Sequence, residues 1–288
     1  MSWIETLING TLLGGLYGLF GLGLAIVFGV MRVVNLAHGE FVVLAAYAGV
    51  FIASSIPGIP PLLLIVPVAA LAFVAGYLMQ ATLINRAMRA PNALSALLTT
   101  FGLSVVLRNA MGELFGADPR AIDAGLLTQV GFELLGLRIG VYPVLVLVIA
   151  VALFGALQWM LTRTSYGRIV RATADDREVA QLMGVQPDRV YNVVMGVSLA
   201  FAAVAGFLLA MRTSFSPFSG IERLLLAFEV VIIGGLGSFW GALLGGIALG
   251  IAQLIGQRID SNSGALYAHL LFFIVLMIRP AGLAGARR

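Results

Sequence analysis

The chain has 288 residues, of which 60% are hydrophobic and 10% charged, with a formal net charge of +4 at pH 7 and a mean hydropathy of +1.04. A soluble domain usually carries about 25% charged residues, so the composition excludes a soluble globular protein and indicates an integral membrane protein. The absence of cysteine excludes disulfides and thiol chemistry. None of the 17 basic residues is a lysine, which excludes a P-loop and Schiff-base chemistry. Any ATP that drives this chain must therefore be hydrolysed by a partner.

Apolar runs suited to membrane helices recur along the whole chain. The first has no basic region before it and no small-residue cleavage site, so we expect a retained span and not a removed signal. The runs cover residues 8–31, 41–56, 61–83, 95–115, 141–162, 191–211, 225–236, 239–257 and 265–279. A helix needs roughly 20 residues to cross the hydrocarbon core, and the seventh and ninth runs are short. We therefore predict a single all-α polytopic membrane domain over residues 1–288, with eight or nine transmembrane segments.

Polar residues interrupt the first two runs in the stretch "NLAHGE", residues 35–40. A helix starting near Gly39 would direct free N–H groups at this break, with Asn35 available as its cap and Glu40 in its first turn. The break is either a cytoplasmic turn before a capped helix or a half-helix end that faces a translocation path. Residues 8–56 accordingly form one broken span or two. His38 and Glu40 make a poor metal site, so we expect neither metal nor cofactor.

Two loops are long enough to hold structure. Residues 116–140 mix acidic residues with arginine, as in a solvated loop, and residues 163–190 are the most polar part of the chain. In the second loop the apolar residues recur at helical spacing after Asp175 and Asp176 and end before a glycine; they are Val179, Leu182 and Met183, followed by Gly184. This pattern predicts a short amphipathic helix, which either lies on the lipid headgroups or docks a soluble partner.

A second glycine-rich stretch covers residues 232–250, "IIGGLGSFWGALLGGIALG". Glycines four residues apart let helix backbones approach closely, which predicts helix packing. The Gly-Gly-Leu-Gly-Ser sequence also predicts a second helix break near residues 234–239, and unwound backbone at membrane depth must be buried in protein or line a cavity. Just before it lies Glu229, a carboxylate within an apolar run, which we expect to be buried and either protonated or paired with Arg108, the arginine within a span.

The distribution of arginine predicts the orientation. If all nine runs cross, one side of the membrane carries 11 arginines and the other five, and the arginine-rich side, with loop 163–190 and the C-terminus, is cytoplasmic. If residues 225–236 only re-enter, the C-terminus changes side and the count becomes nine against seven. Full crossing is therefore the preferred interpretation.

Three stretches together, "NLAHGEFVVLAAY", "RATADDREVAQLMGV" and "VVIIGGLGSFWGALLGG", resemble the permease subunits of branched-chain amino acid ABC importers, the LivH/LivM family, and the H-type subunit more than the M-type. The resemblance covers nearly the whole chain. It implies a multi-pass subunit of the bacterial inner membrane, not an enzyme, that works with a second permease, two cytoplasmic ATPases and a periplasmic solute-binding protein. No interaction with nucleic acid is expected.

The resemblance also implies roles for individual residues. Loop 163–190 matches the cytoplasmic coupling loop of the family, which implies ATPase docking at Glu178, Ala180, Leu182 and Gly184. The apolar spacing described above adds Val179 and Met183 to this docking set. Asn35, His38, Gly39 and Glu40 match the first signature of the family. The expected translocation path combines them with Glu229 and with the residues of the second break, Gly234, Gly235, Gly237 and Ser238. The family commonly has an apolar residue in place of Glu229, which leaves the solute open among hydrophobic amino acids, urea, short amides and aromatic acids.

A transporter of another class remains an alternative. A gradient-driven transporter or channel would use His38, Glu40 and Glu229 as a proton or ion relay and would need no ATPase. A membrane-embedded enzyme is a distant third, because two histidines and no cysteine supply no set of nucleophile, base and orienting group.

Overall fold

The computed structural model describes residues 2–56, 58–92, 94–134 and 136–284. Most of these residues are helical. A short antiparallel hairpin, β1 paired with β2, lies in the loop between α5 and α6. The long helices are α1 (Trp3–Met31), α2 (His38–Ser55), α3 (Pro61–Met79), α5 (Ser95–Phe115), α6 (Val141–Arg163), α9 (Pro187–Arg212), α10 (Gly220–Gly234), α11 (Phe239–Ile259) and α12 (Gly264–Ile278). The shorter elements are η1 (Gln80–Ile84), α4 (Asn85–Met88), η2 (Gly125–Thr128), β1 (Gly131–Leu134), β2 (Leu137–Gly140), α7 (Ser165–Asp175), α8 (Arg177–Leu182) and η3 (Pro217–Ser219).

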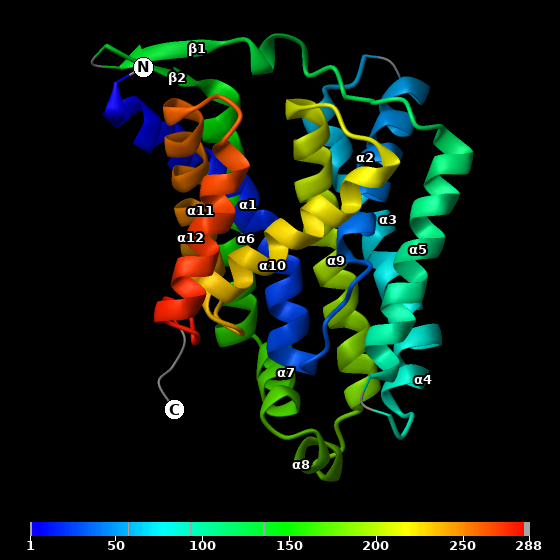
Figure 1. Cartoon of the computed structure of the whole chain (residues 1–288). Helices are drawn as coiled ribbons and strands as arrows, with labels where there is room; N and C mark the ends of the chain where they lie inside the picture. The colour runs from blue at the N-terminus through cyan, green and yellow to red at the C-terminus, as the bar shows by residue number, and fades with distance from the viewer. Residues whose placement is uncertain (1, 57, 93, 135, 285–288) are drawn as a thin grey trace.

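The helices form one bundle whose two ends differ (Figure 1). The hairpin of β1 and β2 lies across one end, called here the hairpin end, and α7 and α8 project from the other, called the α8 end. α1 starts at the hairpin end, and the last described residues after α12 lie at the α8 end, where the Leu283 N–H donates to the Ile233 carbonyl at 2.7 Å. The N-terminal helix start and the C-terminal segment therefore lie at opposite ends of the bundle.

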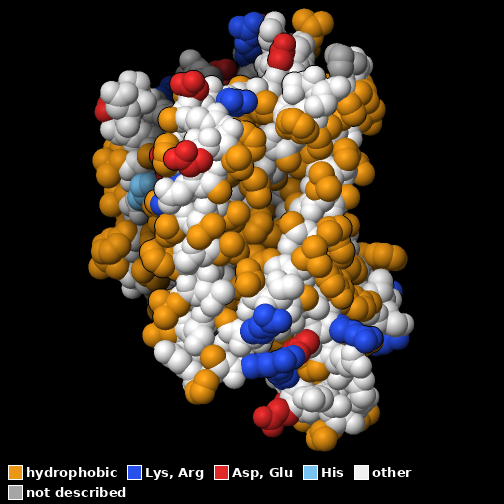
Figure 2. All heavy atoms as spheres, turned by 90° about the vertical axis from the view of Figure 1, so that its right-hand side faces the viewer, with side chains coloured by type: hydrophobic (Ala, Val, Ile, Leu, Met, Phe, Trp, Pro, Cys, Tyr) orange, Lys and Arg blue, Asp and Glu red, His pale blue; other side chains and the backbone are white. Residues whose placement is uncertain are grey.

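The surface matches a membrane protein. Hydrophobic side chains cover the middle of the molecule, whereas arginines gather at the α8 end (Figure 2). In the part of the chain that the structure describes, six helical segments are long and apolar enough to span a membrane: α1, α2, α3 continued to Met88, α6, α9 and α11. The prediction of an all-α polytopic protein is confirmed, while α10 and α12, with 15 residues each, are shorter than a usual span.

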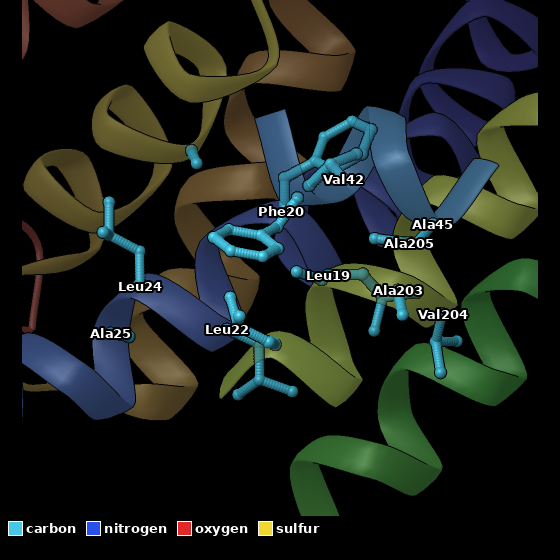
Figure 3. Close-up of a cluster of buried hydrophobic side chains, with 14 of the residues drawn as sticks. Leu19, Phe20, Leu22, Leu24, Ala25, Val42, Ala45, Ala203, Val204 and Ala205 are labelled. Atoms are coloured by element: carbon cyan, nitrogen blue, oxygen red, sulfur yellow. The ribbon is translucent and has the colours of Figure 1, made fainter. Parts of the chain in front are cut away.

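α1 is the central helix of the bundle and is buried on nearly all sides. Its Leu19, Phe20 and Leu22 are fully buried. They pack between two neighbouring helices, α2 near Val42 and α9 near Ala203 (Figure 3). A helix that is hydrophobic all round is expected in such a position. The other helices are arranged around it.

Glycines allow the central helices to approach closely, as the spacing in residues 232–250 predicts. A Cβ on Gly14 of α1 would meet the backbone of Ile247, and one on Gly246 of α11 would meet the backbone of Gly18. The opposite side of α11 contacts α10 in the same way, because a Cβ on Gly245 would meet the Val230 carbonyl. The glycines are therefore packing residues on two faces of α11, and the prediction is confirmed.

Both predicted helix breaks are present. Residues 32–37 are non-helical and run back from the end of α1 into the bundle, where α2 begins at His38 (Figure 1). The second break, residues 235–238, joins α10 to α11 and contains two glycines with positive φ, Gly235 at 98° and Gly237 at 85°. L-amino acids with side chains rarely adopt such angles, which explains the glycines.

Two local features differ from the sequence prediction. The loop 116–140 is not merely solvated coil, because it contains the β1–β2 hairpin, in which Phe132 pairs with Ile139. Loop 163–190 contains two helices, α7 and α8, and not one. The sequence prediction did not include α7, an arginine-rich helix whose apolar residues Tyr166, Ile169 and Val170 also recur at helical spacing.

Candidate functional site

The break before α2 is a closed polar turn inside the subunit. Asn35 and His38 are both 0% exposed, and the Asn35 side-chain oxygen accepts a hydrogen bond from the Ala37 N–H at 3.0 Å. Asn35 therefore closes the turn but does not cap α2, whose N-cap is Ala37. The predicted cap is wrong because the chain makes one further turn before the helix begins. His38 Nε2 lies 3.0 Å from the Phe20 carbonyl of α1.

Glu40, in the first turn of α2, forms an ion pair with α5. Its Oε1 accepts from Arg108 Nη2 at 2.7 Å and from Arg108 Nε at 3.0 Å, and the Glu40 side chain is only 2% exposed. Its Oε2 has no hydrogen-bond partner among the described residues and points at Gly220, where a Cβ would collide with it. The expected pairing of Arg108 with Glu229 is therefore wrong.

Gly39 lies where α2 crosses the start of α10. A Cβ on Gly39 would collide with the Gly220 carbonyl oxygen and would lie 2.8 Å from the Leu224 nitrogen. Gly39 therefore permits a backbone-to-backbone crossing of two helices. Asn35, Ala37, His38 and Glu40 are buried within this subunit, whereas Arg32 at the start of the break is exposed.

Glu229 is buried, as expected, but its partner is His269 of α12. The distance from Glu229 Oε1 to His269 Nδ1 is 2.5 Å, and the two side chains are 2% and 42% exposed. No pairing of His269 with Glu229 was predicted from the sequence. A signal was present, since a histidine and a glutamate in two apolar runs each need a polar neighbour.

The second break forms a compact turn at the α8 end. Ser238 caps α11, because its hydroxyl oxygen accepts from the Gly241 N–H at 3.1 Å. The Gly234 carbonyl accepts from the Ala284 N–H at 3.1 Å, and Gly237 lies against Gly29 near the end of α1. This break, unlike the first, therefore lies close to one end of the bundle.

The predicted amphipathic helix is α8. Asp176 caps it by accepting from the N–H groups of Glu178 and Val179 at 2.8 and 3.0 Å, and Gly184 ends the turn after it with a φ of 85°. Its apolar side chains are unusually exposed: 55% for Val179, 87% for Leu182 and 81% for Met183. Glu178 and Gly184 are exposed too, whereas Ala180 is 3% exposed and packs inward, so its contribution to docking would be indirect.

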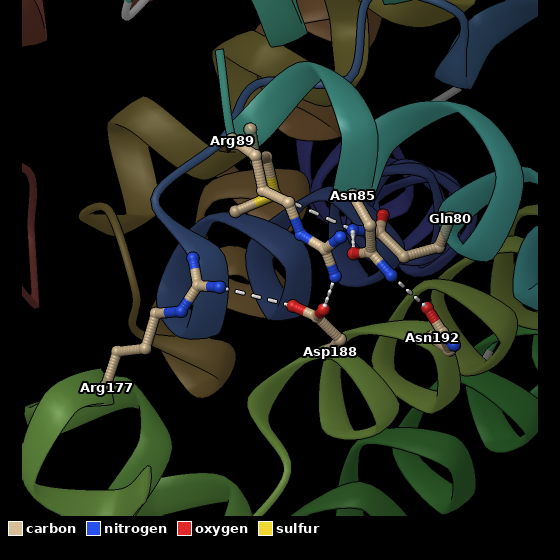
Figure 4. A network of polar contacts seen from close by, with 7 residues as sticks. Gln80, Asn85, Arg89, Arg177, Asp188 and Asn192 are labelled. Atoms are coloured by element: carbon tan, nitrogen blue, oxygen red, sulfur yellow. Dashed lines mark hydrogen bonds and ion pairs between the residues drawn. The ribbon is translucent and has the colours of Figure 1, made fainter. Parts of the chain in front are cut away.

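A polar network holds α8 against the bundle, and the sequence analysis did not anticipate it (Figure 4). Asp188 at the start of α9 pairs with Arg89 after α4 and, at 3.2 Å, with Arg177 of α8. Next to this ion pair, Asn85 accepts from Gln80 at 2.9 Å and donates to Asn192 of α9 at 2.8 Å. The polar Gln80 and Asn85 at the end of an apolar run were its sequence signal.

His38, Glu40 and Glu229 do not form a connected relay in the part of the chain that the structure describes. Each has a different partner: the Phe20 carbonyl, Arg108 and His269. A proton or ion relay requires groups in succession, and this arrangement gives no support to the gradient-driven alternative.

The comparisons with known proteins decide the family. Residues 6–279 match the family model described as the permease component of the branched-chain amino acid transport system. The chain belongs to this family. The match covers both helix breaks, α8 and all the long helices except the first three residues of α1.

Curated relatives in this family align nearly end to end. The permease protein BraD of the high-affinity branched-chain amino acid transport system of Pseudomonas aeruginosa is 29% identical over 98% of this chain and 96% of its own length. The corresponding permease LivH of Escherichia coli K12 is 28% identical over 99% and 96%. A probable branched-chain amino acid transport permease LivH of Methanocaldococcus jannaschii is 26% identical over 93% and 88%. As a member of this family the chain is a transport permease subunit and not an enzyme.

Among solved structures, PsaBC from Streptococcus pneumoniae in complex with Fab aligns with 98% of this chain and 93% of its own, at 13% identity and a TM-score of 0.48.

Proposed function

We propose that this chain is the membrane-spanning permease subunit of a bacterial ABC importer that moves branched-chain or other hydrophobic amino acids into the cytoplasm. The end-to-end family match carries this proposal. The energy comes from ATP hydrolysis in two partner subunits, and a periplasmic solute-binding protein delivers the solute. A second permease, either a sister chain or another copy of this one, completes the pathway across the lipid bilayer.

The exposed surface of α8 supports an ATPase partner. Leu182 and Met183 are more than four-fifths exposed on a helix outside the hydrophobic band, where apolar exposure is expected to mark an interaction site. The ion pairs of Asp188 connect this helix to α9 and to α4, the end of the helical segment that begins with α3, so a force on α8 reaches two spans of the bundle. We infer that Glu178, Val179, Leu182, Met183 and Gly184 dock the ATPase and that Ala180 supports them from below.

The arginine distribution supports an orientation in which the α8 end is cytoplasmic. Loop 163–190 and the described residues after α12 lie at the same end of the bundle, which carries most of the exposed arginine (Figures 1 and 2). The start of α1 and the hairpin then lie on the periplasmic side of the inner membrane.

The two helix breaks are the proposed borders of the translocation path. Near the middle of the bundle the border consists of Asn35 in the first break and of His38, Gly39 and Glu40 in the following first turn of α2. At the second break it consists of Gly235, Gly237 and Ser238, with Gly234 at the end of α10. The support is that unwound backbone at membrane depth lies either within protein or beside a cavity. Asn35, His38 and Glu40 are at most 2% exposed, so a path bordered by them would be closed at their level in this conformation.

Reconstitution tests the function. The chain is purified from a native membrane through an affinity tag, the co-purifying polypeptides are identified, and the complex is placed in proteoliposomes with ATP inside. We expect an ATP-binding subunit and a second permease in the complex, and uptake of labelled leucine that requires ATP and the binding protein. Uptake driven by an ion gradient in the absence of any ATPase would instead support the gradient-driven alternative.

A further inference from the structure

A cleft of about 270 Å³ opens between α1, α10, α11 and α12. Its walls combine aliphatic and polar side chains. Its volume is below the roughly 300 Å³ at which sites for drug-sized ligands begin, so the cleft suits a small solute. The polar groups come from Tyr17, Glu222, Arg223, Gln253 and His269. The apolar wall is formed by Leu225, Leu226, Ala265 and Ala268.

One side of the cleft presents a cation next to a carboxylate. Arg223 is 17% exposed, its Nη2 lies 3.5 Å from Glu222 Oε2, and its buried Nε has no hydrogen-bond partner among the described residues. A contact of 3.5 Å is long for a charge-assisted hydrogen bond, so the guanidinium retains donors for another oxygen pair. Glu222 is 73% exposed and free to move.

The other side is formed by groups on neighbouring helices. Tyr17 of α1 donates to the Gln253 side-chain oxygen of α11, and His269 of α12 contacts Glu229 beneath the cleft. Glu229 lies on the same face of α10 as Glu222 and Leu226, because these residues are three to four positions apart. The second oxygen of Glu229, Oε2, is buried and has no partner within the described part of the chain.

The location of the cleft indicates that it does not face lipid. α10 begins below the end of α9 and crosses the bundle obliquely (Figure 1), and the cleft reaches His269 within the apolar run of α12. Ionisable side chains within a membrane face the bundle interior or a water-filled cavity, and they mark solute pathways. An exposed Glu222 and a half-exposed His269 at this depth therefore require water or a second subunit in front of them.

From these observations we infer that this cleft binds the charged head of a zwitterionic α-amino acid during transport, with Arg223 holding the carboxylate and Glu222 facing the ammonium group. The apolar wall of leucine and alanine side chains receives the aliphatic side chain. Planar guanidinium groups bind carboxylates through two parallel hydrogen bonds, which favours Arg223 over His269 for this task.

This inference rests on the proposed function, and it goes further by assigning the solute class to residues of the permease itself. A neutral amide lacks the carboxylate that would pair with Arg223, and a simple carboxylic acid lacks the ammonium group that would pair with the Glu222 carboxylate. The cleft chemistry thus distinguishes amino acids from urea, amides and acids.

The test is direct binding to the assembled complex. The detergent-solubilised complex of permeases and ATPases, without its binding protein, is incubated with tritiated L-leucine and unlabelled competitors. We expect saturable binding, with L-leucinamide and 4-methylpentanoate competing at least tenfold more weakly than L-leucine. Arg223→Gln should weaken binding at least tenfold and Arg223→Lys less, because lysine keeps the charge but not the paired donors. Arg138→Gln, an exposed arginine on the hairpin, is the matched control and should bind like the wild type.

Uptake in proteoliposomes separates the two levels of the proposal. A wild-type complex that imports leucine, together with an intact Arg223→Gln complex that binds and imports it equally well, overturns the cleft inference and leaves the function standing. Equal competition by all three solutes overturns the inference as well. A wild-type complex that neither binds nor imports any hydrophobic amino acid overturns the function and the cleft assignment together. Arg223→Lys keeps the test valid if the glutamine variant does not assemble.

Discussion

Arg108 of α5 and Glu40 of α2 form a two-hydrogen-bond ion pair, with distances of 2.7 and 3.0 Å to the same carboxylate oxygen. The pair joins a peripheral helix to the helix that starts at the first break. Glu40 is 2% exposed and Arg108 is 23% exposed, so the carboxylate depends on this arginine for its main charge partner.

Removing one member of the pair should destabilise the subunit. Arg108→Gln leaves a buried carboxylate without its cation, and we expect a loss of about 3 kcal/mol, the lower end for breaking a buried pair, because the arginine is partly exposed. The readout is the temperature at which the detergent-solubilised complex loses its monodisperse elution peak. The double variant with Glu40→Gln should recover most of the loss. Strictly additive losses would show that the pair contributes no coupling.

Gly39→Val should damage folding and transport together. The valine side chain would overlap the backbone of Gly220 and Leu224, so α2 and α10 would have to separate. The matched control is Gly102→Val on α5, a glycine with open space where its Cβ would lie. The measurements are the yield of monodisperse complex and leucine uptake per assembled complex. A normal yield with reduced uptake would instead indicate that Gly39 contacts the passing solute.

Replacing Leu182 and Met183 by aspartate should uncouple transport. Both side chains are more than 80% exposed, so the change costs the fold little, whereas truncating a central apolar contact of an interface typically costs at least 1–2 kcal/mol of binding. We expect a normally inserted subunit that retains less ATPase during purification and imports little leucine. Leu126→Asp, 75% exposed at the hairpin end, is the control. Unchanged ATPase retention and uptake would exclude α8 as the docking site.

Asp188→Asn tests the connection between α8 and the rest of the bundle. The ion pairs are largely exposed, so their loss should change the free energy of unfolding by only about 1 kcal/mol or less. The coupling of ATP hydrolysis to leucine import should decrease more than the stability, because α8 loses its ion pairs to α4 and α9. The expected result is nearly normal thermal stability and ATPase retention with a lower ratio of leucine imported to ATP hydrolysed. An unchanged ratio would mean that the network only supports local structure.

Cysteine labelling tests the orientation on a chain that has no native cysteine. Ser165→Cys and Ala284→Cys, both exposed at the α8 end, should resist an impermeant thiol reagent added to intact spheroplasts. Thr128→Cys, exposed in the loop at the hairpin end, should react. All three should react after permeabilisation. Ala286, closer to the C-terminus, would also report on this side of the membrane, but it lies outside the described residues. Ala284 is therefore the position chosen for labelling. Labelling of Ser165→Cys from outside would reverse the proposed orientation.

The sequence by itself determined the class of protein, the approximate helices, both breaks and the α8 helix. These features depend on local causes: long apolar runs, glycine with positive φ, and an aspartate cap before an apolar stripe. They require no knowledge of which helix lies beside which. For the same reason the spacing of Gly246 and Gly250 predicted close packing but not the partner, which is α1.

The tertiary structure decided which polar residues meet. Composition suggested Arg108 for Glu229, but the fold brings Arg108 to Glu40 and His269 to Glu229, over sequence separations of 68 and 40 residues. A buried carboxylate strongly requires a partner, yet nothing in the sequence around it specifies which distant helix supplies one. The cleft around Arg223 likewise exists only because α1, α10, α11 and α12 converge, since the backbone crossings at their glycines set how closely the helices approach.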